Sequence, residues 1–99
     1  MHETVAAERD EVATLCREVR VRRLDVFGSA VGGQFDPDTS DVDVVVDFAG
    51  AIDFDRFFAL KEGLEAIFGR SVDVVLASGM ANPYFRQQVI ATRELLYAA

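Results

Sequence analysis

The chain has 99 residues, with 10 Lys and Arg against 17 Asp and Glu, and a formal net charge of −7 at pH 7. This length suits a single domain, and a hydrophobic content of 51% excludes a disordered chain. The negative charge argues against non-specific binding to nucleic acid, which requires Lys and Arg, and no apolar run approaches the roughly 20 residues that span a bilayer.

The negative charge is concentrated in the middle of the chain. Residues 24–55 carry eight Asp and no Lys, Arg or Glu, a charge of −8, whereas the remaining residues sum to +1. The polar N-terminus lacks the pattern of a signal peptide, and the single cysteine, Cys16, has no partner for an internal disulfide. We therefore expect a cytoplasmic protein in which Cys16 is a small buried apolar residue.

The first half of the chain predicts one helix and two strands. Apolar residues recur every three or four positions over 4–19, which indicates an amphipathic helix. Residues 21–27 and 42–48 predict strands, the second of them rich in β-branched residues. Between them, Gly28-Ser29 ends the first strand, and 30–40 predicts a turn or short helical turn followed by a loop. A connection of this length leaves the relative direction of the two strands open.

The second half predicts a helix, a strand and a final helix. The first helix covers 53–68 and ends at Gly69, and the strand covers 71–76. Asn82-Pro83 is a typical helix start, with the asparagine as N-cap, and this last helix is expected to run to about Tyr97. The side chains expected in the core are Phe54, Phe57, Phe58, Leu64, Ile67 and Phe68 of the first helix and Phe85, Val89, Ile90 and Leu96 of the second.

This order of elements predicts an α/β (α+β) fold in a single domain over residues 1–99. Strands that alternate with helices indicate one small mixed β-sheet with helices packed on it. The order is helix, strand, turn, strand, helix, strand, helix.

Two aspartates at the start of the second strand are candidate metal ligands. Because side chains alternate along a strand, Asp41 and Asp43 share one face, with Cα atoms about 6.5 Å apart. The opposite face, which must be the core, carries Val42, Val44, Val46 and Phe48. Two carboxylates on one face repel each other unless a cation lies between them, and Mg²⁺ or Mn²⁺ prefers oxygen ligands. The alternative for such a pair is a solvated sheet face.

A third aspartate joins this group if the third strand lies beside the second. Asp73 interrupts an otherwise apolar strand. Three carboxylates hold two metal ions in enzymes that carry out in-line phosphoryl transfer. On its own, a strand aspartate is more often solvated than catalytic.

Gly28 and Ser29 are candidate phosphate-binding residues. A glycine at a strand end lets backbone approach a ligand closely, and the serine adds a hydroxyl and backbone N–H groups at the start of a helical turn. A phosphate cradle that faces a metal cluster is what a nucleoside triphosphate requires.

Together these motifs resemble a known family. Phe27-Gly28-Ser29, followed after eleven residues by Ser40-Asp41-Val42-Asp43 and a β-branched strand, is similar to the signature of the DNA polymerase β-like nucleotidyltransferases. The stretches FGSAVGGQFDPDTSDVDVVVDF and GRSVDVVLASGMANPYFRQQVIATRELLY resemble the minimal nucleotidyltransferase (MNT) group within that superfamily. The resemblance covers about residues 20–97.

The resemblance implies roles for five residues. Gly28 and Ser29 match the triphosphate-binding pair, Asp41 and Asp43 match two metal ligands, and Asp73 matches a third carboxylate that is both metal ligand and base. It further implies an Mg²⁺- or Mn²⁺-dependent enzyme that transfers AMP from ATP to a tyrosine of a HEPN-domain toxin and thereby acts as its antitoxin.

The sequence departs from the family at two positions and leaves alternatives open. Many members carry arginine where this chain has Ala30 and Gly32, so positive charge near the phosphates is lost. This favours, as an alternative, an antitoxin that neutralises its partner by binding alone. Residues 36–47 also place aspartates at some positions of a calcium-binding EF-hand loop, but strands are expected on both sides instead of helices. The oligomeric state is open.

Overall fold

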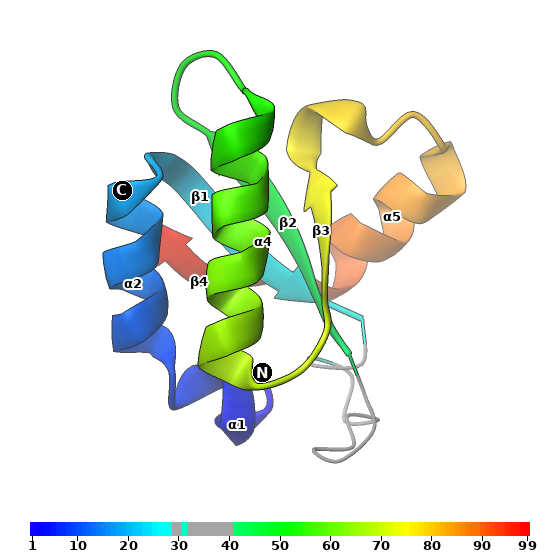
Figure 1. Ribbon diagram of the computed structural model, residues 1–99. Coiled ribbons are helices and arrows are strands. Elements are labelled where there is room, and N and C mark those ends of the chain that lie inside the picture. The colour runs from blue at the N-terminus through cyan, green and yellow to red at the C-terminus, as the bar shows by residue number, and fades with distance from the viewer. Residues whose placement is uncertain (29–30, 32–40) are drawn as a thin grey trace.

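The computed structural model describes residues 1–28, 31 and 41–99 (Figure 1). The helices and strands in chain order are α1 (Glu3–Ala6), α2 (Arg9–Glu18), β1 (Val21–Phe27), β2 (Val42–Phe48), α4 (Phe54–Phe68), β3 (Val72–Leu76), the short 3₁₀ helix η1 (Ala77–Gly79), α5 (Pro83–Thr92) and β4 (Glu94–Ala98). The predicted turn over 30–40, with Ala30 and Gly32, lies outside the described residues except for Val31, as does Ser29.

The strands form one mixed sheet, as the sequence predicts. Among the described residues its order is β3-β2-β1-β4. β1 pairs antiparallel with both β2 and β4, whereas β2 pairs parallel with β3. A parallel pair needs a long crossover connection, and α4 provides it. The direction of β1 relative to β2, which the sequence left open, is therefore antiparallel.

Helices cover both faces of the sheet (Figure 1). Alternate side chains of β2, from Val42 to Phe48, pack with buried residues of α2 and α4 in the larger core cluster. Val45 points to the other face and packs with Phe27, Met80 and Val89, the last of them from α5. None of the helices in the described ranges is both long and apolar enough to cross a membrane.

The C-terminal end differs from the prediction of one long helix. α5 ends at Thr92, and residues 94–98 form the edge strand β4 instead. The backbone of Arg93 is extended (φ −63°, ψ 141°), which ends the helix, and Leu96 then reaches the main core from the sheet. The expected N-terminal helix over 4–19 is likewise divided, into α1 and α2, because the backbone at Glu8 leaves the helical conformation.

Three side chains expected in the core are exposed. In α4 the buried positions 56, 60, 64 and 68 recur every four residues. Phe54 lies two residues before the buried position 56 and Phe58 two residues after it. Each is therefore rotated about 200° around the helix axis from that position and faces outward. Ile90 is next to the buried Val89 and is 55% exposed. Leu64, Phe68, Val89 and Leu96 are buried as expected.

The predicted helix boundaries are confirmed where a side chain or a glycine sets them. The Asn82 side chain accepts hydrogen bonds from the backbone N–H groups of Tyr84 and Phe85, and Pro83 begins α5. Gly69 ends α4 in the left-handed conformation (φ 67°). Cys16 is fully buried, as expected, and burial raises the pKa of its thiol to about 12.

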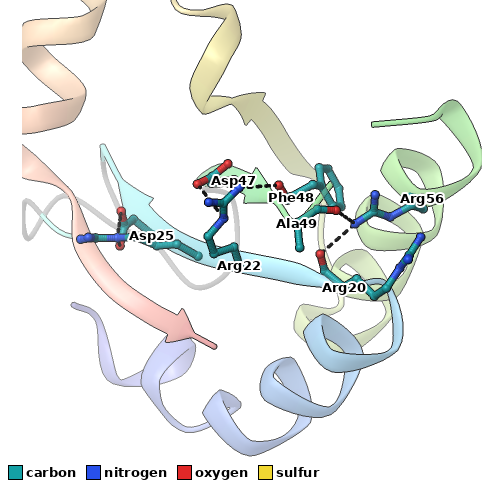
Figure 2. A network of polar contacts seen from close by, with 8 residues as sticks. Arg20, Arg22, Asp25, Asp47, Phe48, Ala49 and Arg56 are labelled. Carbon is teal, nitrogen blue, oxygen red and sulfur yellow. Dashed lines mark hydrogen bonds and ion pairs between the residues drawn. The ribbon is translucent and has the colours of Figure 1, made fainter. Parts of the chain in front are cut away.

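A buried arginine joins three segments at the start of α4 (Figure 2). The Arg56 guanidinium donates to the carbonyl oxygens of Val19 (3.0 Å), Arg20 (2.8 Å) and Ala49 (2.9 Å), and also to that of Ala51. It lies 4.9 Å from the centroid of the Phe48 ring. Arg56 therefore ties the end of α2 to the connection between β2 and α4 without any acidic partner in the described structure.

We predict that Arg56→Lys lowers the free energy of unfolding by about 2–4 kcal/mol, because a lysine ammonium cannot reach four carbonyl oxygens in this planar arrangement. Urea unfolding followed by circular dichroism measures the change. Arg17→Lys, on the exposed side of α2, is the matched control and should change stability by less than about 0.5 kcal/mol. Equal stability of the two variants would contradict the structural role of Arg56.

Candidate active site

The centre of the candidate site is a pair of aspartates on neighbouring strands. β2 and β3 run parallel with Asp43 directly opposite Asp73. Both lie on the sheet face that carries Val45, away from the core beneath α2 and α4. The two carboxyl groups are close enough that Asp73 influences the ionisation of Asp43.

The pair perturbs its own ionisation. Burial raises the pKa of Asp43 from its ordinary value of 3.8 to about 6, and the charge of Asp73, the hydrogen bond to it and the charge of Asp41 add to the effect. This carboxyl group therefore changes from protonated to ionised at about pH 6. A cation placed between the two carboxylates would relieve the same repulsion.

Asp41 is the third aspartate near this pair. It is exposed and directly precedes β2, whose first residue, Val42, donates its N–H to the Ser71 carbonyl at 3.2 Å. That bond holds the beginnings of β2 and β3 together. Across residues 1–28, 31 and 41–99, no three His, Cys, Asp or Glu side chains converge closely enough to be a preformed metal site. The all-oxygen donor set of Asp43 and Asp73, with the charge of Asp41 nearby, fits Mg²⁺ or Mn²⁺.

Gly28 lies against the aspartate pair. Phe27, the last residue of β1, pairs with Asp43, and Gly28 follows in the left-handed conformation (φ +69°). A Cβ atom at this position would lie 2.8 Å from Oδ2 of Asp43. A side chain at this position would have to displace the Asp43 carboxylate, and the positive φ separately favours glycine. The role predicted for Ser29 falls outside the described residues and stays a prediction.

Comparison with known proteins identifies the family. Residues 11–99 match the model of the family "Polymerase beta, Nucleotidyltransferase". The chain belongs to this family. It is therefore a nucleotidyltransferase, and its mixed sheet with packed helices is the minimal nucleotidyltransferase fold.

Individual relatives agree with this assignment. The chain is 44% identical over 73 residues to the protein adenylyltransferase MntA of Thermococcus cleftensis, covering 70% of this chain and 73% of that protein. A solved structure assigned to the minimal nucleotidyltransferases is 35% identical with a TM-score of 0.79, covering 95% of both chains. A toxin–antitoxin structure with AMP-PNP, at 23% identity, has a TM-score of 0.71 over 92% of this chain and 73% of that one, and it shows the fold alone.

The sequence analysis missed a second polar group on the same sheet face of this nucleotidyltransferase. Asp25 of β1 is 2% exposed, and its Oδ2 lies 3.0 Å from Nε of Arg23 and 3.7 Å from Nε of Arg93. Because side chains alternate along a strand, Asp25 lies on the sheet face opposite to the one that carries Leu24 and Val26. The sequence could not show that Arg93, from the far end of the chain, would lie beside it.

The remaining aspartate of β2 lies in a different setting. Asp47 is exposed and pairs with Arg22 at 3.4 Å, so this end of the strand carries a surface ion pair instead of a carboxylate cluster (Figure 2). Residues 42–47, the second half of the stretch that resembles an EF-hand loop, belong to the strand β2. This disagrees with the calcium alternative, which requires a loop there followed by a helix.

We predict that stability falls as the pH rises through 6 when divalent ions are chelated. The pKa of Asp43 is about 6 in the folded state and near 3.8 when unfolded, so the native state binds more protons between these values. The stabilisation is fully present below about pH 4 and is lost as the pH passes about 6. Asp43→Asn should flatten this profile and exceed the wild-type Tm at about pH 8, whereas Asp47→Asn should follow the wild type. Parallel profiles for wild type and Asp43→Asn, measured by thermal unfolding, would contradict the assignment.

We predict that Gly28→Ala disturbs Asp43, whereas Gly50→Ala does not. Both glycines have positive φ (69° and 71°), so both substitutions should cost about 1 kcal/mol of backbone strain. Only at position 28 would the new Cβ meet a carboxylate, because nothing lies within 4 Å of the corresponding point at Gly50. Titration of the Asp43 carboxyl carbon by NMR should therefore shift its midpoint in the first variant alone. The same midpoint in both would show that the close approach has no effect on the site.

Proposed function

We propose that this nucleotidyltransferase transfers an adenylyl group from ATP, with Mg²⁺ or Mn²⁺, to a tyrosine hydroxyl of a HEPN-domain toxin and so acts as its antitoxin. The observation that carries the proposal is the aspartate pair Asp43–Asp73 beside Gly28, with the exposed Asp41 nearby. The proposed setting is the cytoplasm, where ATP is available.

Named relatives support the choice of reaction and partner. The relative from Thermococcus cleftensis is a protein adenylyltransferase. A structure of a tri-AMPylated Shewanella oneidensis HEPN toxin in complex with MNT antitoxin has a TM-score of 0.68 to this chain at 21% identity, covering 96% of this chain and 73% of that one. The fold is thus compatible with an MNT–HEPN assembly.

Each residue has a defined part in the proposed reaction. Asp41, Asp43 and Asp73 would hold the divalent ions, which neutralise the triphosphate and the departing pyrophosphate when bound. Gly28 and Ser29 would hold the triphosphate through the backbone and the serine hydroxyl. The tyrosine oxygen forms a bond to the α-phosphorus, the bond from that phosphorus to the oxygen bridging to the β-phosphate breaks, and the hydroxyl proton passes to the Asp73 carboxylate.

Asp73 is suited to receive that proton. It is exposed at the start of β3, whereas its partner Asp43 is half-buried. An acceptor can therefore approach Asp73 from solvent while Asp43 stays fixed between β1 and β3.

A second candidate function is neutralisation of the toxin by binding alone. The observation that favours it is the loss of positive charge at Ala30 and Gly32, where many family members carry arginine. The two functions differ in whether the carboxylates are needed.

We predict that Asp41→Asn combined with Asp43→Asn lowers adenylyl transfer by about a hundredfold or more, because the amides cannot hold the divalent ions. The assay follows label from α-³²P-ATP into the HEPN-domain protein of the same genome, with Mg²⁺ or with EDTA. Asp47→Asn, on the same face of β2 but paired with Arg22, is the control and should keep full activity.

Two outcomes decide between the functions. Label transfer that survives in the double variant would reject the proposed chemistry. A double variant that transfers no label but still protects growth against the toxin would favour neutralisation by binding.

A further inference from the structure

Large apolar side chains gather on the surface at the N-terminal end of α4. Ile52, Phe54 and Phe58 are 44%, 80% and 50% exposed. The rings of Phe54 and Phe58 stack at 6.4 Å, and Phe57 meets Phe58 edge-on at 5.6 Å. Together they form the α4 apolar surface, around a cavity of about 360 Å³ lined by Ile52, Asp53, Phe54, Phe57, Phe58 and Leu76.

This surface is separate from the candidate active site. Leu76 packs against the core on the α4 side of the sheet, whereas Asp73 points to the other face. Leu76 also lies three residues beyond Asp73, about 10 Å along the strand. Figure 1 shows the start of α4 and the end of β3 together at the top of the molecule, away from the beginnings of β2 and β3. An occupant of the α4 apolar surface would therefore leave the aspartate pair open.

The rim of the α4 apolar surface is acidic. Asp53 and Asp55 flank Phe54, and Glu62 is exposed one helical turn beyond Phe58. The cations of α4 are engaged elsewhere: the Arg56 guanidinium is used by backbone carbonyls, and Lys61 contacts Glu65 (3.1 Å) and the Val72 carbonyl (2.7 Å). The described part of α4 thus presents aromatic side chains surrounded by unneutralised negative charge.

An apolar cavity with an acidic rim favours one class of binding partner. A second copy of the chain would bring acidic rims together, and an anionic membrane surface would be repelled in the same way. A small polar ligand would find only Asp53, whose carboxylate already accepts the Arg56 N–H at 2.8 Å. A protein surface with an apolar side chain between lysines or arginines would fill the cavity and neutralise the rim.

We propose that the α4 apolar surface is the docking site for a basic protein partner, which inserts an aliphatic or aromatic side chain among Phe54, Phe57 and Phe58. This assignment rests on the proposed function in one respect, since it names the acceptor protein as that partner. The partner is held on one side of the sheet, and the aspartate pair on the other side stays free to receive a segment that carries the acceptor hydroxyl.

The test measures binding of the HEPN-domain protein of the same genome to the full chain by titration calorimetry without ATP. Phe54→Ser combined with Phe58→Ser, and separately Asp55→Lys, should each raise Kd at least about tenfold. Asp55→Lys changes an exposed charge only, so it tests the surface even if the phenylalanine variant is unstable. Tyr84→Ser combined with Ile90→Ser removes comparably exposed apolar side chains from α5 and should leave Kd unchanged.

Kinetics separate docking from chemistry. In the transfer assay the phenylalanine variant should raise KM for the protein acceptor about tenfold or more and keep kcat, because saturating partner restores the complex. The catalytic variant Asp41→Asn with Asp43→Asn should bind the partner with wild-type affinity. Binding that depends on the α4 apolar surface without any label transfer would reject the proposed function and retain the docking site.

Four outcomes would overturn the docking site. These are an unchanged Kd in both the phenylalanine and the Asp55→Lys variants, no binding of the HEPN-domain protein by the wild-type chain, self-association in sedimentation that Phe58→Ser abolishes, and flotation of the wild-type chain with phosphatidylcholine vesicles. The last two would assign the surface to a second copy or to a membrane.

Discussion

The parallel pairing of β2 with β3 is the constraint on which the rest of the structure depends. It places Asp43 opposite Asp73 and at the same time requires a crossover, which α4 supplies. The position at which α4 begins is fixed by Arg56. Its guanidinium donates to carbonyl oxygens at the end of α2 and in the connection between β2 and α4. The fold and the candidate site thus share one structural cause, because the register that buries the β2 valines also aligns the carboxylates.

This alignment opposes stability. Burial raises the pKa of Asp43 to about 6, and repulsion by the facing carboxylate of Asp73 adds to this rise. The surrounding sheet compensates, since β2 is paired on both sides and its opposite face is fully packed. Strain of this kind is typical of sites where an ion or a reacting group later supplies the missing positive charge.

Local patterns in the sequence predicted the elements whose causes are local. Strand alternation gave the faces of β2, and Asn82 and Gly69 set helix ends through contacts within a few residues. The missed features involve residues far apart in the sequence: Leu96 of β4 packs in a core formed by other elements, and Arg93 lies 3.7 Å from the buried Asp25 of β1. Likewise, the apolar pattern of α4 could not show which of its phenylalanines the sheet would cover. The roles of the five motif residues stay predictions, with Ser29 outside the described structure.

The aspartates of residues 24–55 differ in the charges and hydrogen-bond donors that surround them. Asp25 is neutralised by two arginines, Asp47 pairs with Arg22, and Asp53 caps α4. Among the described residues, negative charge without an ion pair remains in two places of this region, at the aspartate pair with Asp41 and at Asp53 and Asp55 beside the exposed phenylalanines. At the first the geometry suits the proposed divalent ion, and at the second it suits the cationic surface of the proposed protein partner, so the two proposals draw on different parts of the same excess of aspartate.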